Sequence, residues 1–133
     1  MNPTYPGKIL LIDDDQDTRD IYSEFLTNGG FSVDLAADGE EGLAKILQGG
    51  YDLILLDIMM PKIDGITILK KLKENPPDVY NGPIVILSAL DQEYVVKSAM
   101  ELGAKGFLAK SSMNPDEALK KISEFMQTPK TPA

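Results

Sequence analysis

The sequence predicts a single α/β domain in which a five-stranded parallel sheet is doubly wound with five helices. Apolar runs alternate with helical patterns from one end of the chain to the other, and several of these runs are apolar throughout. Strands of that kind belong to parallel sheets that helices cover on both faces. The 133 residues are the length of one domain, and right-handed crossovers place helices on both sides of the sheet.

The apolar runs give the expected strands. The second run alternates with a period of two through Phe31, Val33 and Leu35, as an edge strand with one wet face does. The expected strands are residues 8–12, 31–37, 51–57, 83–89 and 105–110.

Helix signals fill the intervals between these runs. Asn114, followed by Pro115 and by Glu117, is a good helix start, because it offers a cap, a proline at the first position and a glutamate three residues on. Apolar stripes mark the faces expected to be buried, including Ile21 on the first helix and Tyr94 on the fourth. The expected helices run from Asp17 to Asn28, from Asp38 to Gly49, from Asp64 to the prolines at 76–77, from the fourth strand to Gly103, and onward from Asn114.

The composition excludes several kinds of chemistry. The chain has no cysteine and no histidine, so disulfides, thiolate sites and histidine bases are ruled out. A net charge of −8 argues against a nucleic-acid-binding surface and fits a protein that meets cations or other proteins. With no apolar run as long as a membrane span and no signal segment, the expected location is the cytoplasm.

The expected domain covers residues 8–127. Residues 1–7 read as an N-terminal tail, and residues 128–133 read as a C-terminal tail or the start of a linker. Both a stand-alone protein and a piece of a longer regulator fit this organisation.

Polar side chains stand where four of the expected strands end. They are Asp13 to Asp15, Asp57, Ser88 and Lys110. Each could be an ordinary solvated strand end, but the carboxyl ends of parallel strands meet at one edge of the sheet, where doubly wound folds bind ligands. Together these residues predict a site.

The expected chemistry of this site is metal-assisted phosphoryl transfer. Carboxylates 4 Å apart repel by about 4 kcal/mol at an effective dielectric near 20, so Asp13, Asp14 and Asp57 need a cation among them. Carboxylate oxygens without His or Cys select Mg²⁺ or a similar ion. An ion and the Lys110 amine can neutralise phosphoryl oxygens, the Ser88 hydroxyl can donate to one, and a carboxylate can attack in line.

Four sequence blocks resemble the receiver domain of response regulators in two-component signalling, similar to the single-domain chemotaxis regulators. They are "ILLIDDD", "LILLDIMMPKIDG", "IVILSA" and "GAKGFLAK", and the resemblance covers about residues 7 to 127. It implies the flavodoxin-like strand order 2-1-3-4-5. It also implies that Asp57 accepts a phosphoryl group from a phosphohistidine of a sensor histidine kinase or a histidine phosphotransfer protein. No catalytic turnover is implied beyond self-phosphorylation and slow autodephosphorylation.

The same resemblance implies roles for the other site residues. Asp14, Asp57 and the carbonyl of Met59 would bind Mg²⁺, and Asp13 would reach the ion through water. Lys110 would pair with the aspartate and then with the phosphoryl group. Ser88 would move to that group while Phe107 turns inward behind it. Asp15 is expected to cap the first helix instead, and the downstream partner is not identified.

Three positions depart from the usual receiver pattern. Ser111 follows Lys110 where many receivers have a proline, which puts a cis peptide there in doubt. Met59 and Leu90 stand where a polar side chain could orient a water molecule, and neither can do so. A long-lived phosphorylated state is therefore expected.

The main alternative is an aspartate-nucleophile phosphohydrolase of the haloacid dehalogenase type. There Asp13 would attack and Asp15 would act as the acid, with Ser88 and Lys110 in support. That reading leaves the "LLDIMMPKIDG" block unexplained. A receiver-like module that works without phosphorylation is disfavoured by the full acceptor set, and a flavin binder is disfavoured by the anionic turn after the first strand.

Overall fold

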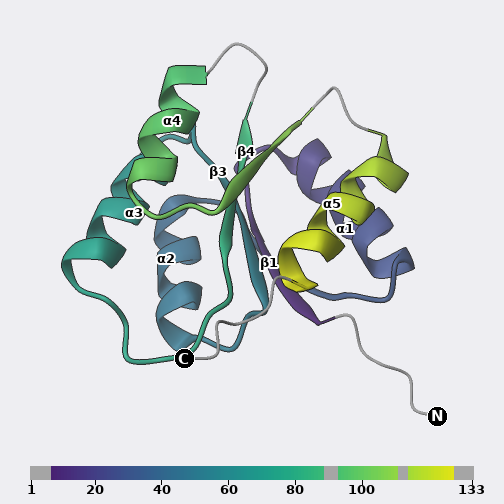
Figure 1. Cartoon of the computed structure of the whole chain (residues 1–133), viewed down its shortest axis with the longest axis horizontal. Helices are drawn as coiled ribbons and strands as arrows, with labels where there is room; N and C mark the ends of the chain where they lie inside the picture. The colour runs from purple at the N-terminus through teal and green to yellow at the C-terminus, as the bar shows by residue number, and fades with distance from the viewer. Residues whose placement is uncertain (1–6, 89–92, 111–113, 128–133) are drawn as a thin grey trace.

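The computed structural model describes residues 7–88, 93–110 and 114–127. Its centre is a parallel five-stranded sheet in the order β2-β1-β3-β4-β5 (Figure 1), which confirms the predicted fold class and strand order. The strands are β1 (Lys8–Ile12), β2 (Ser32–Ala36), β3 (Leu53–Asp57), β4 (Ile84–Ser88) and β5 (Gly106–Ala109). The order reverses between β1 and β3, and such a reversal opens a crevice at the carboxyl ends of the two strands.

Helices cover both faces of the sheet. Within the described residues these are α1 (Gln16–Asn28), α2 (Gly39–Gln48), α3 (Gly65–Glu74), α4 (Glu93–Glu101) and α5 (Pro115–Gln127). Figure 1 shows α2, α3 and α4 on one side of the sheet and α1 and α5 on the other. None of the helices in the described part combines the length and the apolar character needed to cross a bilayer.

The buried apolar side chains follow the alternation of the strands. Leu10, Ile54 and Ile86 face α2, α3 and α4, while Leu11 and Leu55 face α1 and α5. Because the inner strands bury both sets, they read as continuous apolar runs in the sequence.

Helix caps explain where the helices begin. Asp15, Asp38 and Asp64 each accept a hydrogen bond from the backbone N–H three residues on, as N-caps do. Asn114 and Glu117 bond each other's backbone N–H, which confirms the predicted start of α5. Asp15 therefore caps α1, as predicted.

Several side chains differ from the sequence expectation, among them Leu47 and Met100, which are 49% and 40% exposed. Ile21 and Tyr94 were expected on buried faces but are 58% and 78% exposed, because the buried faces of α1 and α4 are carried by neighbours such as Leu26 and Val96. Asp34 lies on the expected wet face of β2, which is an edge strand as predicted, but it is half-buried and accepts a hydrogen bond from the Tyr51 hydroxyl at 2.8 Å.

Candidate functional site

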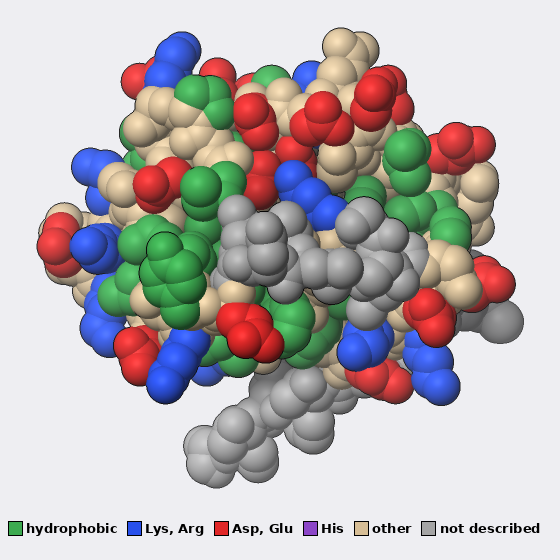
Figure 2. All heavy atoms as spheres, turned by 90° about the horizontal axis from the view of Figure 1, so that it is seen from above, with side chains coloured by type: hydrophobic (Ala, Val, Ile, Leu, Met, Phe, Trp, Pro, Cys, Tyr) green, Lys and Arg blue, Asp and Glu red, His purple; other side chains and the backbone are tan. Residues whose placement is uncertain are grey.

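Three carboxylates meet at the crevice between β1 and β3. Asp13 and Asp14 follow β1, and Asp57 is the last residue of β3. One oxygen of each carboxylate lies within 4.8 Å of the others. Asp13 and Asp57 are buried while Asp14 is exposed, so the cluster opens to solvent on the Asp14 side. Figure 2 looks down on the carboxyl ends of the strands and shows acidic side chains gathered there beside a basic one.

Lys110 brings the compensating charge from the far edge of the sheet. Its Nζ lies 2.9 Å from Asp13 Oδ2 and 3.2 Å from Asp57 Oδ2. Among the described residues, neither oxygen has a hydrogen-bond partner with good directional geometry. One ammonium therefore serves two buried carboxylates, and the site keeps an excess of negative charge.

The pKa values reflect that excess. Burial, with the Asp13 charge added to it, raises the pKa of the Asp57 carboxyl to about 7, although Lys110 and the Met59 amide act in the opposite direction. Burial by itself lowers the pKa of Lys110. The close contact with Asp13 and the charges of both aspartates outweigh burial, so the pKa of Lys110 is raised. A further cation at this place would relieve the repulsion.

Asp15 faces away from the cluster. Its Oδ2 accepts hydrogen bonds from the backbone N–H of Thr18 at 2.9 Å and from the Thr18 hydroxyl at 2.7 Å. These bonds lower the pKa of the Asp15 carboxyl. Such a group holds its proton poorly, which counts against the acid role that the phosphohydrolase alternative gives it.

The remaining predicted residues lie near the cluster in distinct settings. Ser88 is buried at the end of β4, and its carbonyl accepts the Lys110 N–H at 2.9 Å. Phe107 on β5 is 50% exposed, so its ring faces outward. The Met59 N–H donates to Asp57 Oδ1 at 3.3 Å, and the Met59 side chain is exposed. Leu90 and the Lys110–Ser111 peptide involve residues outside the described ranges.

Sequence reasoning missed Arg19. Its Nη1 donates to the carbonyl of Asp13 at 2.8 Å, so it contacts the acidic turn from the first turn of α1. The signal in the sequence is a lone basic residue among the acids at the start of a helix that follows the triplet.

The donor set fits a hard divalent cation. It consists of carboxylate oxygens, two of which lack a directional partner, and the chain contains no histidine or cysteine to favour a softer metal. Asp13, Asp14 and Asp57 could hold Mg²⁺ at this place.

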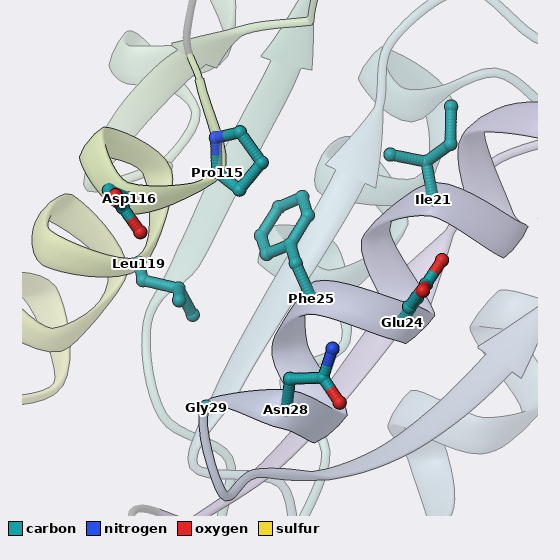
Figure 3. A pocket seen from close by; sticks show the side chains of 8 residues that line it. All are labelled: Ile21, Glu24, Phe25, Asn28, Gly29, Pro115, Asp116 and Leu119. Atoms are coloured by element: carbon teal, nitrogen blue, oxygen red, sulfur yellow. The ribbon is translucent and has the colours of Figure 1, made fainter.

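A groove of about 550 Å³ lies elsewhere, between α1 and α5 (Figure 3). Ile21, Phe25 and Leu119 form much of its apolar wall, and Glu24 and Asp116 add acidic groups. It contains none of the aspartates of the metal cluster, so we place the chemistry at the cluster.

Comparison with known proteins defines the class. The response regulator receiver domain family matches residues 9–123, and the chain belongs to this family. It is similar to the chemotaxis protein CheY of Treponema pallidum, with 37% identity over 92% of this chain and 84% of that protein. It is 38% identical to the transcriptional regulatory protein DltR of Streptococcus agalactiae over 86% of this chain, and it spans about half the length of that regulator.

Solved structures agree with this membership. The receiver domain of the Francisella response regulator 1452 is 32% identical and superimposes with a TM-score of 0.75, covering 91% of this chain and 97% of that one. The chemotaxis protein CheY4 of Vibrio cholerae is 28% identical with a TM-score of 0.75, covering 89% and 97%. The protein is a receiver domain of the two-component response-regulator type.

Proposed function

We propose that Asp57 accepts a phosphoryl group from a phosphohistidine on a sensor histidine kinase or a histidine phosphotransfer protein, with Mg²⁺ held by Asp13, Asp14 and Asp57. The observation that carries this proposal is the pair of buried carboxylates that share the Lys110 ammonium, with Asp57 at the mouth of the β1–β3 crevice. The carbonyl of Met59 is a further proposed ligand, and Asp13 would reach the ion through water.

In the proposed step a carboxylate oxygen of Asp57 attacks the phosphorus atom. An O–P bond forms, the P–N bond to the donor imidazole breaks, and its electron pair stays on that nitrogen. Bound Mg²⁺ would supply neutralisation of charge on the phosphoryl oxygens. Lys110, already within 3.2 Å of Asp57, is placed to pair with the transferred group. The Ser88 hydroxyl would donate a hydrogen bond to a phosphoryl oxygen.

This chain would then act as a switch and not as an enzyme with turnover. The phosphoryl group stays on the protein until slow hydrolysis removes it. Movement of Ser88 toward the group would free the space into which the outward-facing Phe107 ring turns, and this would shift a pre-existing equilibrium in partner affinity.

The proposed partners are a phosphodonor protein and a downstream protein. DltR is named as a transcriptional regulator, but this chain spans about half of such a protein, and we propose no direct nucleic-acid or membrane contact for the part described. We propose the cytoplasm as the location, where fractionation can check it.

Acetyl phosphate with Mg²⁺ tests the proposal, with intact mass as the readout. The parent should gain one phosphoryl group, Asp57→Asn should gain none, and Asp15→Asn should be labelled like the parent because Asp15 serves α1 as a cap. Labelling of Asp57→Asn equal to that of the parent would show that Asp57 is not the phosphoryl acceptor. Steady turnover of a small phosphoester would favour the phosphohydrolase alternative instead.

A further inference from the structure

The acidic turn after β1 is held from behind by a cation on α1. Arg19 Nη1 donates to the carbonyl of Asp13 at 2.8 Å, and the Arg19 side chain is half-buried. A guanidinium bond to a buried carbonyl is charge-assisted, and such bonds are about twice as strong as neutral ones.

Each polar group of Asp13 has a hydrogen-bond or ion-pair partner. Its N–H donates to Ala36 O at 3.1 Å, its Oδ1 accepts the Asp15 N–H at 2.9 Å, and its Oδ2 lies 2.9 Å from Lys110 Nζ. The Arg19 bond completes the set at the carbonyl. The peptide unit between Asp13 and Asp14 begins at that carbonyl, so its orientation decides where the exposed Asp14 carboxylate points.

The helix itself fixes where Arg19 stands. Asp15 caps α1, and the Arg19 N–H donates to the Asp15 carbonyl at 3.0 Å in the first helical bond. Arg19 thus holds the segment from Asp13 to Asp15 by two hydrogen bonds, one from its backbone N–H to Asp15 O and one from its side chain to Asp13 O.

We propose that Arg19 is a positioning residue for the divalent-cation site, which holds the Asp13–Asp14 peptide unit in the orientation that presents Asp14 to the ion. The inference rests on the cation site of the proposed function. Arg19 then has two opposing effects on Mg²⁺ affinity. Its positive charge repels the ion and lowers the affinity, whereas its bond to Asp13 O orients the Asp14 carboxylate and raises the affinity.

The two effects have opposite signs, which makes a sharp test. If Arg19 acted only as a charge, its neutralisation would tighten Mg²⁺ binding. If it positions the turn, its loss weakens binding, since partners that orient metal ligands commonly contribute roughly 10–100-fold in affinity.

The variants are Arg19→Met, which keeps length without donors, and Arg19→Lys, which keeps the charge and a donor. Lys73→Met is the matched control, because Lys73 is an exposed cation in the last turn of α3, at the other end of the fold. Mg²⁺ affinity is measured by titration calorimetry, and exchange of the Asp15 amide hydrogen is measured in the metal-free protein. Urea midpoints verify that each variant is folded.

We expect Mg²⁺ affinity to fall roughly tenfold in Arg19→Met, less in Arg19→Lys, and not in Lys73→Met. The Asp15 amide should exchange faster in Arg19→Met, because its acceptor, Asp13 Oδ1, is no longer held. Mg²⁺ binding as tight as or tighter than that of the parent in Arg19→Met, or unchanged exchange, overturns the inference.

Failure of the proposed function gives a different pattern. A parent that binds Mg²⁺ but is not labelled by acetyl phosphate contradicts phosphoryl acceptance, while the affinities still decide the role of Arg19. A parent that binds no Mg²⁺ overturns both.

Discussion

Replacing Asp57 by asparagine is expected to stabilise the metal-free protein at neutral pH, although it removes the proposed phosphoacceptor. Asp57 is 3% exposed, and its carboxyl lies near that of Asp13 and shares Lys110 with it. Burial and the Asp13 charge destabilise an ionised carboxylate at this position, and asparagine has a similar shape without the charge.

The magnitude follows from the pKa. Burial, together with Asp13, moves the pKa of Asp57 from an ordinary 3.8 to about 7, a difference of about three pH units. Each unit corresponds to about 1.4 kcal/mol, which sets an upper limit of about 4 kcal/mol. This pKa already includes the ion pair with Lys110, but the buried amide of the variant needs new hydrogen-bond partners, so we expect a gain of about 2 kcal/mol, or roughly 1 M in the urea midpoint.

The pH dependence has a defined sign. The folded-state pKa of Asp57 is raised from 3.8 to about 7. The contribution of this carboxyl to folding stability is therefore complete below pH 3.8, where it is protonated in both states, and it is lost as the pH rises towards about 7. The gain in Asp57→Asn should therefore shrink to about a quarter between pH 7.5 and pH 4.5. In the parent, Mg²⁺ at ten times its dissociation constant should restore about 1.4 kcal/mol.

Urea unfolding in EDTA is the assay, with Asp78→Asn as the control. Asp78 is exposed in the α3–β4 connection, so its replacement removes one negative charge away from the cluster. Should Asp57→Asn be no more stable in EDTA at pH 7.5 than Asp78→Asn, the repulsion argued for the site is absent.

Three further outcomes are expected. Met59→Asn combined with Leu90→Glu should shorten the lifetime of the phosphorylated state roughly tenfold or more, because polar side chains can orient water. Mg²⁺ affinity should change little. Decay no faster than in the parent would show that these two positions do not set the lifetime. Amide exchange with beryllofluoride and Mg²⁺ should change across residues 88–112, and an unchanged profile would contradict the proposed Ser88–Phe107 switch. Lys62 has a φ of 67°, which is strained for a residue with a side chain, so Lys62→Gly should raise the free energy of unfolding by up to about 1 kcal/mol. Lys70→Gly within α3 should lower it by about 1 kcal/mol, and a lower free energy of unfolding in both variants would refute strain at Lys62.

Much of the fold could be predicted because its signals are local. Inner strands buried on both faces must be apolar throughout, and caps such as Asp38 and Asn114 mark helix starts by short-range bonds. The meeting of Asp13 and Asp57 follows from topology, since carboxyl ends of neighbouring parallel strands share one edge.

Long-range side-chain geometry could not be predicted in the same way. The resemblance implies that Lys110 pairs with Asp57, but Lys110 follows β5, two strands or roughly 10 Å from β3, and only the folded chain shows that its ammonium also reaches Asp13. A lone basic residue among acids marks Arg19 in the sequence, but the residue types do not show that it donates to the Asp13 carbonyl. The exposure of Ile21 was also hidden, because the position of α5 beside α1 decides which apolar side chains of α1 are covered.

Borohydride trapping tests the central claim most directly. The reagent reduces an aspartyl phosphate to homoserine, so the parent is incubated with acetyl phosphate and Mg²⁺, reduced, digested and sequenced by mass spectrometry. We predict homoserine at position 57, dependent on Mg²⁺. Homoserine at position 13, or a phosphoryl group on Ser88 with Asp57 unmodified, would contradict the account.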